Sequence, residues 1–223
     1  MDISERKTGQ SQGELLHPSQ SAPCSAPLLA LPLHLCSLTL PFQDAPLIIS
    51  NHICFMDPIY LVSQSGASPV SASSNMSIPL FGNLTKMFQP ILVDRASKDS
   101  GKDVAKKIKD RATSGGKWPQ TVLFPEGLTT NGQALTYFKL GAFTPNVPVQ
   151  PVLCRYNNKL TDLGWVDGGP GVGELAFKCL CSPWINMSVE YLPPYVPNEA
   201  EKEDTHLFAR NVRQVMADKL QVS

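Results

Sequence analysis

A histidine and an aspartate stand five positions apart, as His52 and Asp57, in the stretch NHICFMDPIY (51–60). An imidazole held by a carboxylate at one nitrogen can take a proton from a hydroxyl with its other nitrogen, which is general-base catalysis. On one continuous helix the two side chains would point about 140° apart, because each residue turns by about 100°. They can meet only if the backbone turns between them. The sequence predicts such a turn, because a buried strand ends at Ser50 and Pro58 disfavours helical geometry at the aspartate.

Both residues also have ordinary structural explanations. Asp57 before Pro58 is a good N-cap for a helix, and His52 can be a loop histidine with satisfied hydrogen bonds. Cys54 offers a different chemistry, that of a cysteine hydrolase in which His52 activates the thiol. Two positions along a turning loop usually point side chains in different directions, which makes Cys54 the weaker candidate. The segment alone leaves these alternatives open.

The elements that must position these residues follow from the apolar pattern, which from Pro46 onward predicts strands alternating with helices. Such alternation favours an α/β fold in which helices cover both faces of a mostly parallel central sheet. The helix after His52 is expected to begin at Pro58, because proline is favoured in the first turn. The predicted strands are 46–50, 69–74, 90–95, 120–127, 147–156 and 187–195, and the predicted helices are 58–64, 78–89, 101–116, 173–184 and 199–221.

Three of the predicted strands end in polar residues. His52 follows the first strand, Asp94 and Arg95 end another, and Glu126 and Gly127 end a third. In a parallel sheet the carboxyl ends of the strands lie along one edge, where binding and catalytic sites form. The sequence therefore predicts that these groups converge on one edge of the sheet.

Composition and charge exclude several classes of function. The chain has 223 residues, which suits one domain with or without a tail. Its 19 basic and 19 acidic side chains give a formal net charge of zero, without the basic footprint of a nucleic-acid-binding protein, so no nucleic-acid partner is expected. The cysteines lack the paired spacing of a zinc site, so no metal site is expected and they are interpreted as thiols of a reducing compartment. They are Cys24, Cys36, Cys54, Cys154, Cys179 and Cys181.

The first part of the chain differs from the rest. Residues 1–43 are rich in Ser, Gln, Pro and Leu without a steady period, so they are expected to form a low-order N-terminal tail, with the folded domain at 44–223. The tail contains a short apolar segment, 28–40, which is too short to span a bilayer and is interrupted by Pro32. It is interpreted as loosely packed tail, and a segment lying on a membrane surface is the alternative.

Four sequence blocks occur in a particular order along the chain. With NHICFMDP, PILVDR, LFPEGLTTNG and VPVQPV in this order, the sequence resembles glycerolipid acyltransferases of the lysophospholipid type, above all the lysophosphatidylcholine acyltransferases. The stretches FPEGLTTNGQALTYFKLGAF and PVQPVLCRYNNKL carry the most specific part of the likeness, which extends over residues 45–222. The resemblance implies the fold of that family for nearly all of the foldable chain.

The resemblance also implies roles for individual residues. His52 would remove the proton from the free hydroxyl of a lysophospholipid, and Asp57 would orient the imidazole. The resulting alkoxide would attack the thioester of acyl-CoA, which is a co-substrate, and no metal or other cofactor is implied. Arg95 would bind the substrate phosphate, although a surface salt bridge is its alternative. The remaining implied substrate-binding residues are Glu126, Gly127, Thr129, Thr130 and Asn131, the last three with turn or capping roles as alternatives.

The implied partners are acyl-CoA, a lysophospholipid and a membrane surface, at the cytosolic face of the endoplasmic reticulum or of lipid droplets. Two features depart from the family. Leu128 stands where a hydroxyl residue is usual, and only 28–40 could supply an apolar segment ahead of the histidine. These departures suggest a truncated form with weakened membrane attachment. They keep open a second function, that of a catalytically weak lipid-binding or regulatory isoform with the same fold.

Overall fold

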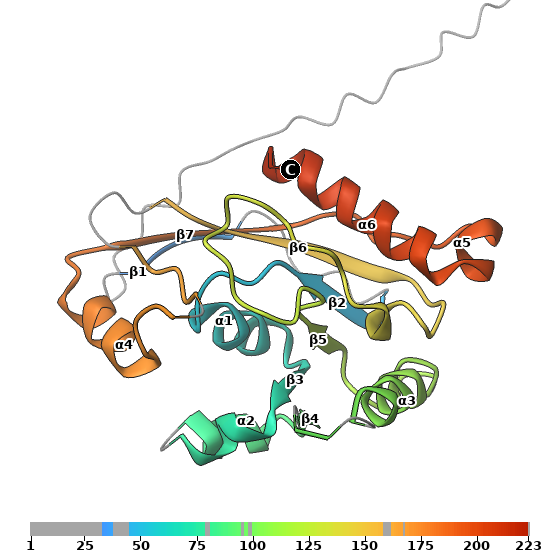
Figure 1. The fold of residues 1–223 in the computed structure, drawn as a ribbon, viewed down its shortest axis with the longest axis horizontal. Coiled ribbons are helices and arrows are strands. Elements are labelled where there is room, and N and C mark those ends of the chain that lie inside the picture. Colours follow the sequence, from blue (N-terminus) through green and yellow to red (C-terminus); the bar gives the residue numbers. More distant parts are fainter. Residues whose placement is uncertain are drawn as a thin grey trace, which may run out of the picture.

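The computed structural model shows an α/β fold built on a seven-stranded sheet with the order β1-β7-β6-β2-β5-β3-β4. Among the described strands, five pairs are parallel, and β6 and β7 pair antiparallel. Helices α1 and α6 lie on opposite faces of the sheet (Figure 1). The predicted fold class is therefore confirmed. The residues that the structure describes are 33–37, 45–78, 81–94, 96–97, 100–157, 162–166 and 168–222.

The strands and helices alternate along the chain, as the apolar pattern predicts. The strands are β1 (Leu33–Ser37), β2 (Leu47–Ser50), β3 (Ser68–Ala72), β4 (Ile91–Val93), β5 (Thr121–Leu123), β6 (Val149–Tyr156) and β7 (Ile185–Tyr191). The helices are α1 (Met56–Ser65), α2 (Phe81–Met87), α3 (Ser100–Ala112), α4 (Val172–Cys181), α5 (Glu199–Glu203) and α6 (Thr205–Leu220), with short 3-10 helices at Ser73–Ser77 and Leu140–Ala142.

Strand β2 lies at the centre of the sheet and is buried on both faces. Leu47 and Ile49 pack into one core with Phe208 of α6, whereas Ile48 packs into a second core with Leu61 of α1. Successive side chains of a strand point to opposite faces, so a continuous apolar run is required where both faces are covered. This double burial holds the end of β2, and the residues that follow it, in a fixed place.

The predicted tail contributes one strand to the sheet. Residues 33–37 form β1, which pairs in parallel with β7 from Leu33 opposite Ile185 to Ser37 opposite Val189. The prediction of a tail outside the fold is therefore wrong for these five residues. Their place depends on the open edge of β7, a partner far away in sequence. The other residues of the predicted tail, 1–32 and 38–43, lie outside the described residues.

The predicted helix 199–221 is divided into α5 and α6 by Asp204. This residue has an extended backbone, and its side chain accepts a hydrogen bond from the His206 backbone N–H, so it caps α6. An aspartate that satisfies free N–H groups favours the start of a new helix over continuation of the old one. Among the described helices, none is long and apolar enough to cross a membrane.

Candidate active site

The ends of three neighbouring strands meet beside His52. β2 lies between β5 and β6 and pairs with both in parallel, so all three end at the same edge of the sheet. The loop after β2 carries His52, Phe124 follows β5, and Tyr156 ends β6. The predicted convergence is confirmed for the strands that precede His52 and Glu126. Arg95, which is predicted to join them, lies outside the described residues.

His52 and Asp57 meet as the spacing predicts. Nδ1 of His52 lies 3.0 Å from Oδ2 of Asp57, whose side chain is fully buried, while the His52 side chain is 16% exposed. The same oxygen accepts the backbone N–H groups of Ile53 at 2.7 Å and Cys54 at 2.8 Å. The carboxylate is therefore fixed by the backbone that carries the histidine, and it can fix the imidazole in turn.

The local backbone at Asp57 differs from the prediction. Asp57 is the second residue of α1 and is helical, and Phe55, not Asp57, occupies the N-cap position. A proline is tolerated at position 58 because the first N–H groups of a helix have no partner inside the helix. The turn that unites His52 and Asp57 therefore lies between β2 and α1, and the carboxylate reaches back across it.

Tyr156 is a member of the site that sequence patterns do not indicate. Its hydroxyl donates to Oδ1 of Asp57 at 2.6 Å, from the end of β6. Burial raises the pKa of the Tyr156 phenol well above its usual range, and the negative charge of Asp57 raises it further. The phenol therefore stays protonated and acts as a donor. The one feature that could have indicated Tyr156 is its position at the end of β6, the strand that pairs with β2.

Tyr156→Phe is expected to lower both stability and activity. The substitution removes the hydroxyl that donates to Oδ1 of Asp57, and a hydrogen bond to a charged group contributes about 1.5–3 kcal/mol to the free energy of unfolding. Denaturant unfolding measures that loss. We expect the acyl-transfer rate to fall less than in variants of Asp57 itself, because the bond to His52 is kept. An unchanged unfolding free energy would contradict the bond.

The remaining contacts of His52 come from the chain after β5. Its ring stacks on Phe124 with centroids 4.1 Å apart. Its backbone N–H donates to Oε1 of Glu126 at 3.2 Å, and its carbonyl accepts the N–H of Thr130 at 2.9 Å. Among the described residues, none forms a hydrogen bond with Nε2 of the ring, so this nitrogen is available to a substrate hydroxyl.

Glu126 and Gly127, the Glu-Gly pair of the block LFPEGLTTNG, are packed closely against the chain that follows them. Glu126 is 2% exposed, and its Oε2 accepts the N–H and the hydroxyl of Thr136 at 3.0 and 3.1 Å. Gly127 has a φ of +69°, and the side chain of Lys139 lies where a Cβ would stand. The backbone conformation therefore favours glycine at position 127, whereas the flexible end of the Lys139 side chain could move to make room for a Cβ.

The polar residues that follow are engaged within the protein. The hydroxyl of Thr129 donates to the carbonyl of Trp165, and that of Thr130 accepts the N–H of Gly132 at 3.2 Å. Asn131 is exposed, and its Oδ1 accepts the N–H of Gln133 at 3.1 Å. These contacts agree with the turn roles left open for the three residues. They leave the Asn131 amide group as the most accessible donor among them.

Cys54 is buried in an apolar cluster with Leu163, Cys179 and Ile185. Burial raises the pKa of the Cys54 thiol to about 12, and the charge of Asp57 adds to the shift. A thiol of this kind is a poor nucleophile at neutral pH, which argues against the cysteine hydrolase. Cys54, Cys154, Cys179 and Cys181 are free thiols, and the described side chains include no group of three or more His, Cys, Asp or Glu that could hold a metal ion.

Cys54→Ser is expected to leave more than half of the transfer activity. Alkylation of Cys54 is expected to be slow at neutral pH and to accelerate as pH rises toward about 12, because only the thiolate reacts. Mass spectrometry of the peptide that contains Cys54 measures the alkylation rate at neutral and at high pH, with the exposed Cys181 as an internal reference. Rapid inactivation by alkylation at Cys54 would revive the cysteine mechanism.

Comparison with known proteins gives consistent results. A family model described as Acyltransferase matches residues 38–155. Lysophosphatidylcholine acyltransferase 1 of Danio rerio is 42% identical over 181 residues, covering 81% of this chain and 35% of that protein. Lysophosphatidylcholine acyltransferase 2 of Mus musculus is 43% identical over 180 residues, covering 80% of this chain and 33% of that protein. The chain thus spans about a third of the length of the curated relatives it matches.

A solved structure shares the fold. The 1-acyl-sn-glycerophosphate (LPA) acyltransferase PlsC of Thermotoga maritima matches with a TM-score of 0.55 at 15% sequence identity, covering 85% of this chain and 73% of that chain. At this identity the match bears on the fold alone. Because the family model covers more than half of the residues, and the fold agrees with it, the chain belongs to the Acyltransferase family.

Proposed function

We propose that this chain transfers a fatty acyl group from acyl-CoA to the free hydroxyl of a lysophospholipid such as lysophosphatidylcholine. The observation that carries the proposal is the 3.0 Å contact between Nδ1 of His52 and Oδ2 of a fully buried Asp57. This contact leaves Nε2 as the basic nitrogen. The likeness to lysophosphatidylcholine acyltransferases supports the choice of acceptor.

The proposed reaction needs no covalent enzyme intermediate. Nε2 of His52 takes the hydroxyl proton of the acceptor while the oxygen attacks the thioester carbonyl. A carbon–oxygen bond forms, the carbon–sulfur bond breaks, and the CoA thiolate leaves with the proton from the imidazolium. Asp57 stabilises the positive charge of the ring during the step. General-base catalysis of this kind accelerates a reaction by about 10²–10⁴-fold.

The substrate contacts are proposed from the third block and from Arg95. Arg95 is proposed to bind the phosphate, because a guanidinium can pair with two phosphate oxygens. Gly127 shapes the turn of this loop, and its N–H donates to the carbonyl of Phe124 at 3.0 Å, while Asn131 offers an exposed amide group four residues later. Thr129 and Thr130 belong to the same loop. Leu128 is 46% exposed beside Gly127, where it would present an apolar surface to the acceptor.

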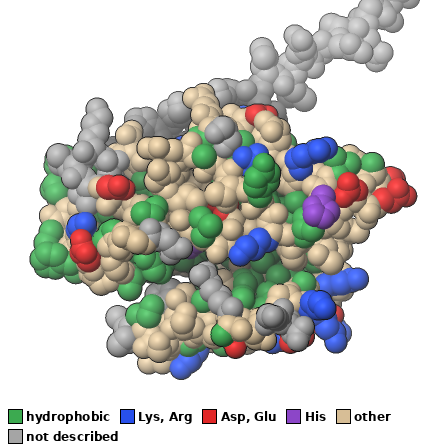
Figure 2. Space-filling model, in the orientation of Figure 1, with side chains coloured by type: hydrophobic (Ala, Val, Ile, Leu, Met, Phe, Trp, Pro, Cys, Tyr) green, Lys and Arg blue, Asp and Glu red, His purple; other side chains and the backbone are tan. Residues whose placement is uncertain are grey.

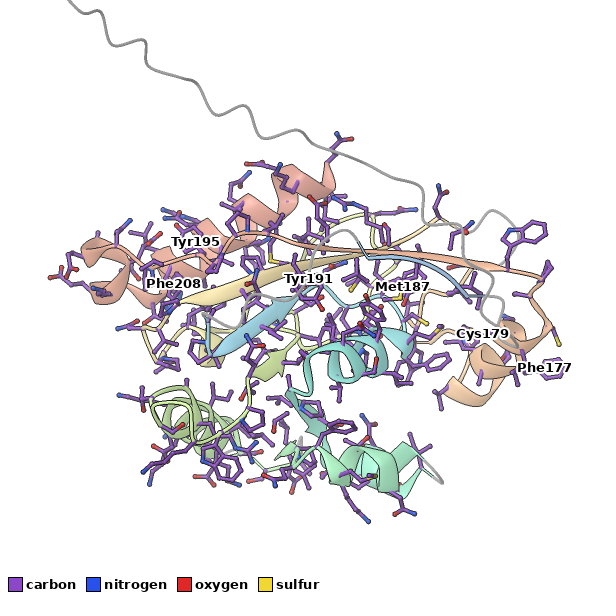
Figure 3. All side chains as sticks on the ribbon, turned by 180° about the vertical axis from the view of Figure 1, so that it is seen from behind. Phe177, Cys179, Met187, Tyr191, Tyr195 and Phe208 are labelled. Atoms are coloured by element: carbon purple, nitrogen blue, oxygen red, sulfur yellow. The ribbon has the colours of Figure 1, made fainter. Side chains whose placement is uncertain are left out.

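A membrane surface is proposed as the partner of α4. Phe177 and Leu180, three positions apart on this helix, and Trp184, just after it, are each more than half exposed. Hydrophobic side chains gather over α4 (Figure 2), and Phe177 points away from the molecule while Cys179 points inward (Figure 3). Exposed aromatic and aliphatic side chains on a short amphipathic helix suit the lipid headgroup boundary.

The position of α4 supports a lipid surface as its partner. The sulfur of Cys179 lies 3.9 Å from that of Met56, which precedes Asp57 at the start of α1. The inward side of α4 therefore packs against the start of α1, and a lipid on its exposed side would lie across the helix from the proposed catalytic pair. Residence at the cytosolic face of the endoplasmic reticulum or of lipid droplets is proposed from the family resemblance.

The test is an acyl-transfer assay with the full chain on phosphatidylcholine vesicles. Lysophosphatidylcholine and acyl-CoA are supplied, and both the diacyl product and free CoA thiol are measured. We expect the two products in equal amounts. Vesicle binding without transfer to any lysophospholipid would instead favour the catalytically weak lipid-binding protein.

A further inference from the structure

The loop that follows β5, residues 126–136, forms hydrogen bonds with both the N–H and the carbonyl of His52. The N–H of His52 donates to the Glu126 side chain at 3.2 Å, and the carbonyl of His52 accepts the N–H of Thr130 at 2.9 Å. Both backbone polar groups of the proposed base are therefore bound by a loop that begins 74 residues later in the chain. Backbone groups held at both ends leave the residue little freedom to move.

Both oxygens of Glu126 already accept hydrogen bonds from inside the protein. One oxygen accepts from His52, and the other accepts the N–H and the hydroxyl of Thr136 at 3.0 and 3.1 Å. The residue is 2% exposed. A buried carboxylate is stable only where hydrogen bonds replace water, and these three donors supply them.

We propose that Glu126 is a positioning residue, which holds the main chain of His52 against the 126–136 loop and does not contact the acceptor. This inference rests on the proposed function, and it replaces the expectation that Glu126 binds an acceptor hydroxyl. Its physical effect is to keep Nε2 at the distance at which proton transfer occurs. A displacement of about 1 Å can slow such a step by about 100-fold.

The substitution Glu126→Gln distinguishes a positioning role of Glu126 from a role in binding the acceptor hydroxyl. Each oxygen of Glu126 accepts a backbone N–H, one from His52 and one from Thr136, and a backbone N–H cannot turn around to accept. The NH2 group of a glutamine amide would therefore oppose a backbone donor in either orientation. A substrate hydroxyl, by contrast, can donate or accept, so an amide would serve a substrate-binding role nearly as well.

The expected result is a loss of kcat with little change in substrate affinity. For Glu126→Gln we expect kcat to fall by about 100-fold while the KM for lysophosphatidylcholine stays within about 2-fold. Glu203→Gln, on the exposed end of α5, is the matched control and should match the wild type. A raised KM with kcat retained would overturn the proposal in favour of substrate binding.

Hydrogen–deuterium exchange tests the contact without relying on activity. Glu126→Gln should speed exchange at the His52 amide, measured in a peptide that begins several residues before His52 and includes it, and Glu203→Gln should not. If the wild type shows no transfer, the proposed function fails, while exchange still decides whether Glu126 holds His52. Unchanged exchange would overturn the inference.

If Glu126→Gln does not fold, the milder Thr136→Val removes only the hydroxyl bond and should lower kcat by about 3- to 10-fold at constant KM.

Discussion

His52→Ala is expected to reduce acyl transfer by about 10³-fold while the protein stays folded. The variant loses the nitrogen that we propose as the base, and Asp57 cannot replace it because its side chain is fully buried. The fold should persist, since Oδ2 of Asp57 keeps two backbone donors and Oδ1 keeps Tyr156. Product formation on vesicles and a thermal melt of the same preparation measure the two expectations.

The control for this variant is another histidine of the same chain. His206 is exposed on α6, and only its backbone N–H takes part in a described hydrogen bond, so His206→Ala should transfer acyl groups at the wild-type rate. Wild-type activity in His52→Ala would remove this residue from the reaction. Equal loss in both variants would point to a general effect of histidine replacement.

Asp57→Asn should lower kcat by about 10²–10³-fold with almost no change in geometry. The amide oxygen can replace Oδ2, where Ile53, Cys54 and His52 donate. The amide NH2 can replace Oδ1, because the Tyr156 hydroxyl can turn to accept from it. The variant therefore removes the negative charge that stabilises the imidazolium and keeps the orientation of the ring. Steady-state kinetics at saturating acceptor measures the loss.

Two further variants complete this comparison. Asp57→Ala also removes the acceptor for two backbone N–H groups and should be less stable and less active than Asp57→Asn. Asp110→Asn, on the exposed surface of α3, should behave as the wild type. If Asp57→Asn retained full kcat, the charge of Asp57 would have no part in catalysis, and its role would be limited to orientation.

Much of the fold follows from local patterns in the sequence. The continuous apolar run that precedes His52 marks β2 as doubly buried, and the end of that run marks the turn that a contact between His52 and Asp57 requires. The detail of that turn does not follow. Pro58 suggests an extended Asp57, but proline is also compatible with the first turn of a helix, and the structure places Asp57 there.

The parts that escape prediction depend on long-range contacts. Tyr156 reaches Asp57 across 99 residues, and nothing near either residue marks the pairing. The contact of Glu126 with the His52 backbone spans 74 residues and is also not marked by the residues near either end. The strand at Leu33–Ser37 is likewise decided by its partner β7 and not by its own composition.

The order of the strands in the sheet has a consequence for protein synthesis. His52 finds Asp57 within five residues, but its partner Glu126 emerges from the ribosome 74 residues after it, and Tyr156 emerges 99 residues after Asp57. β5 must also enter between β2 and β3, which precede it in the chain. A nascent chain that stops before β6 therefore carries the proposed catalytic pair with one edge of β2 uncovered. Chain growth past Tyr156 is the step that completes the surroundings of the pair, and non-local pairings of this kind form slowly.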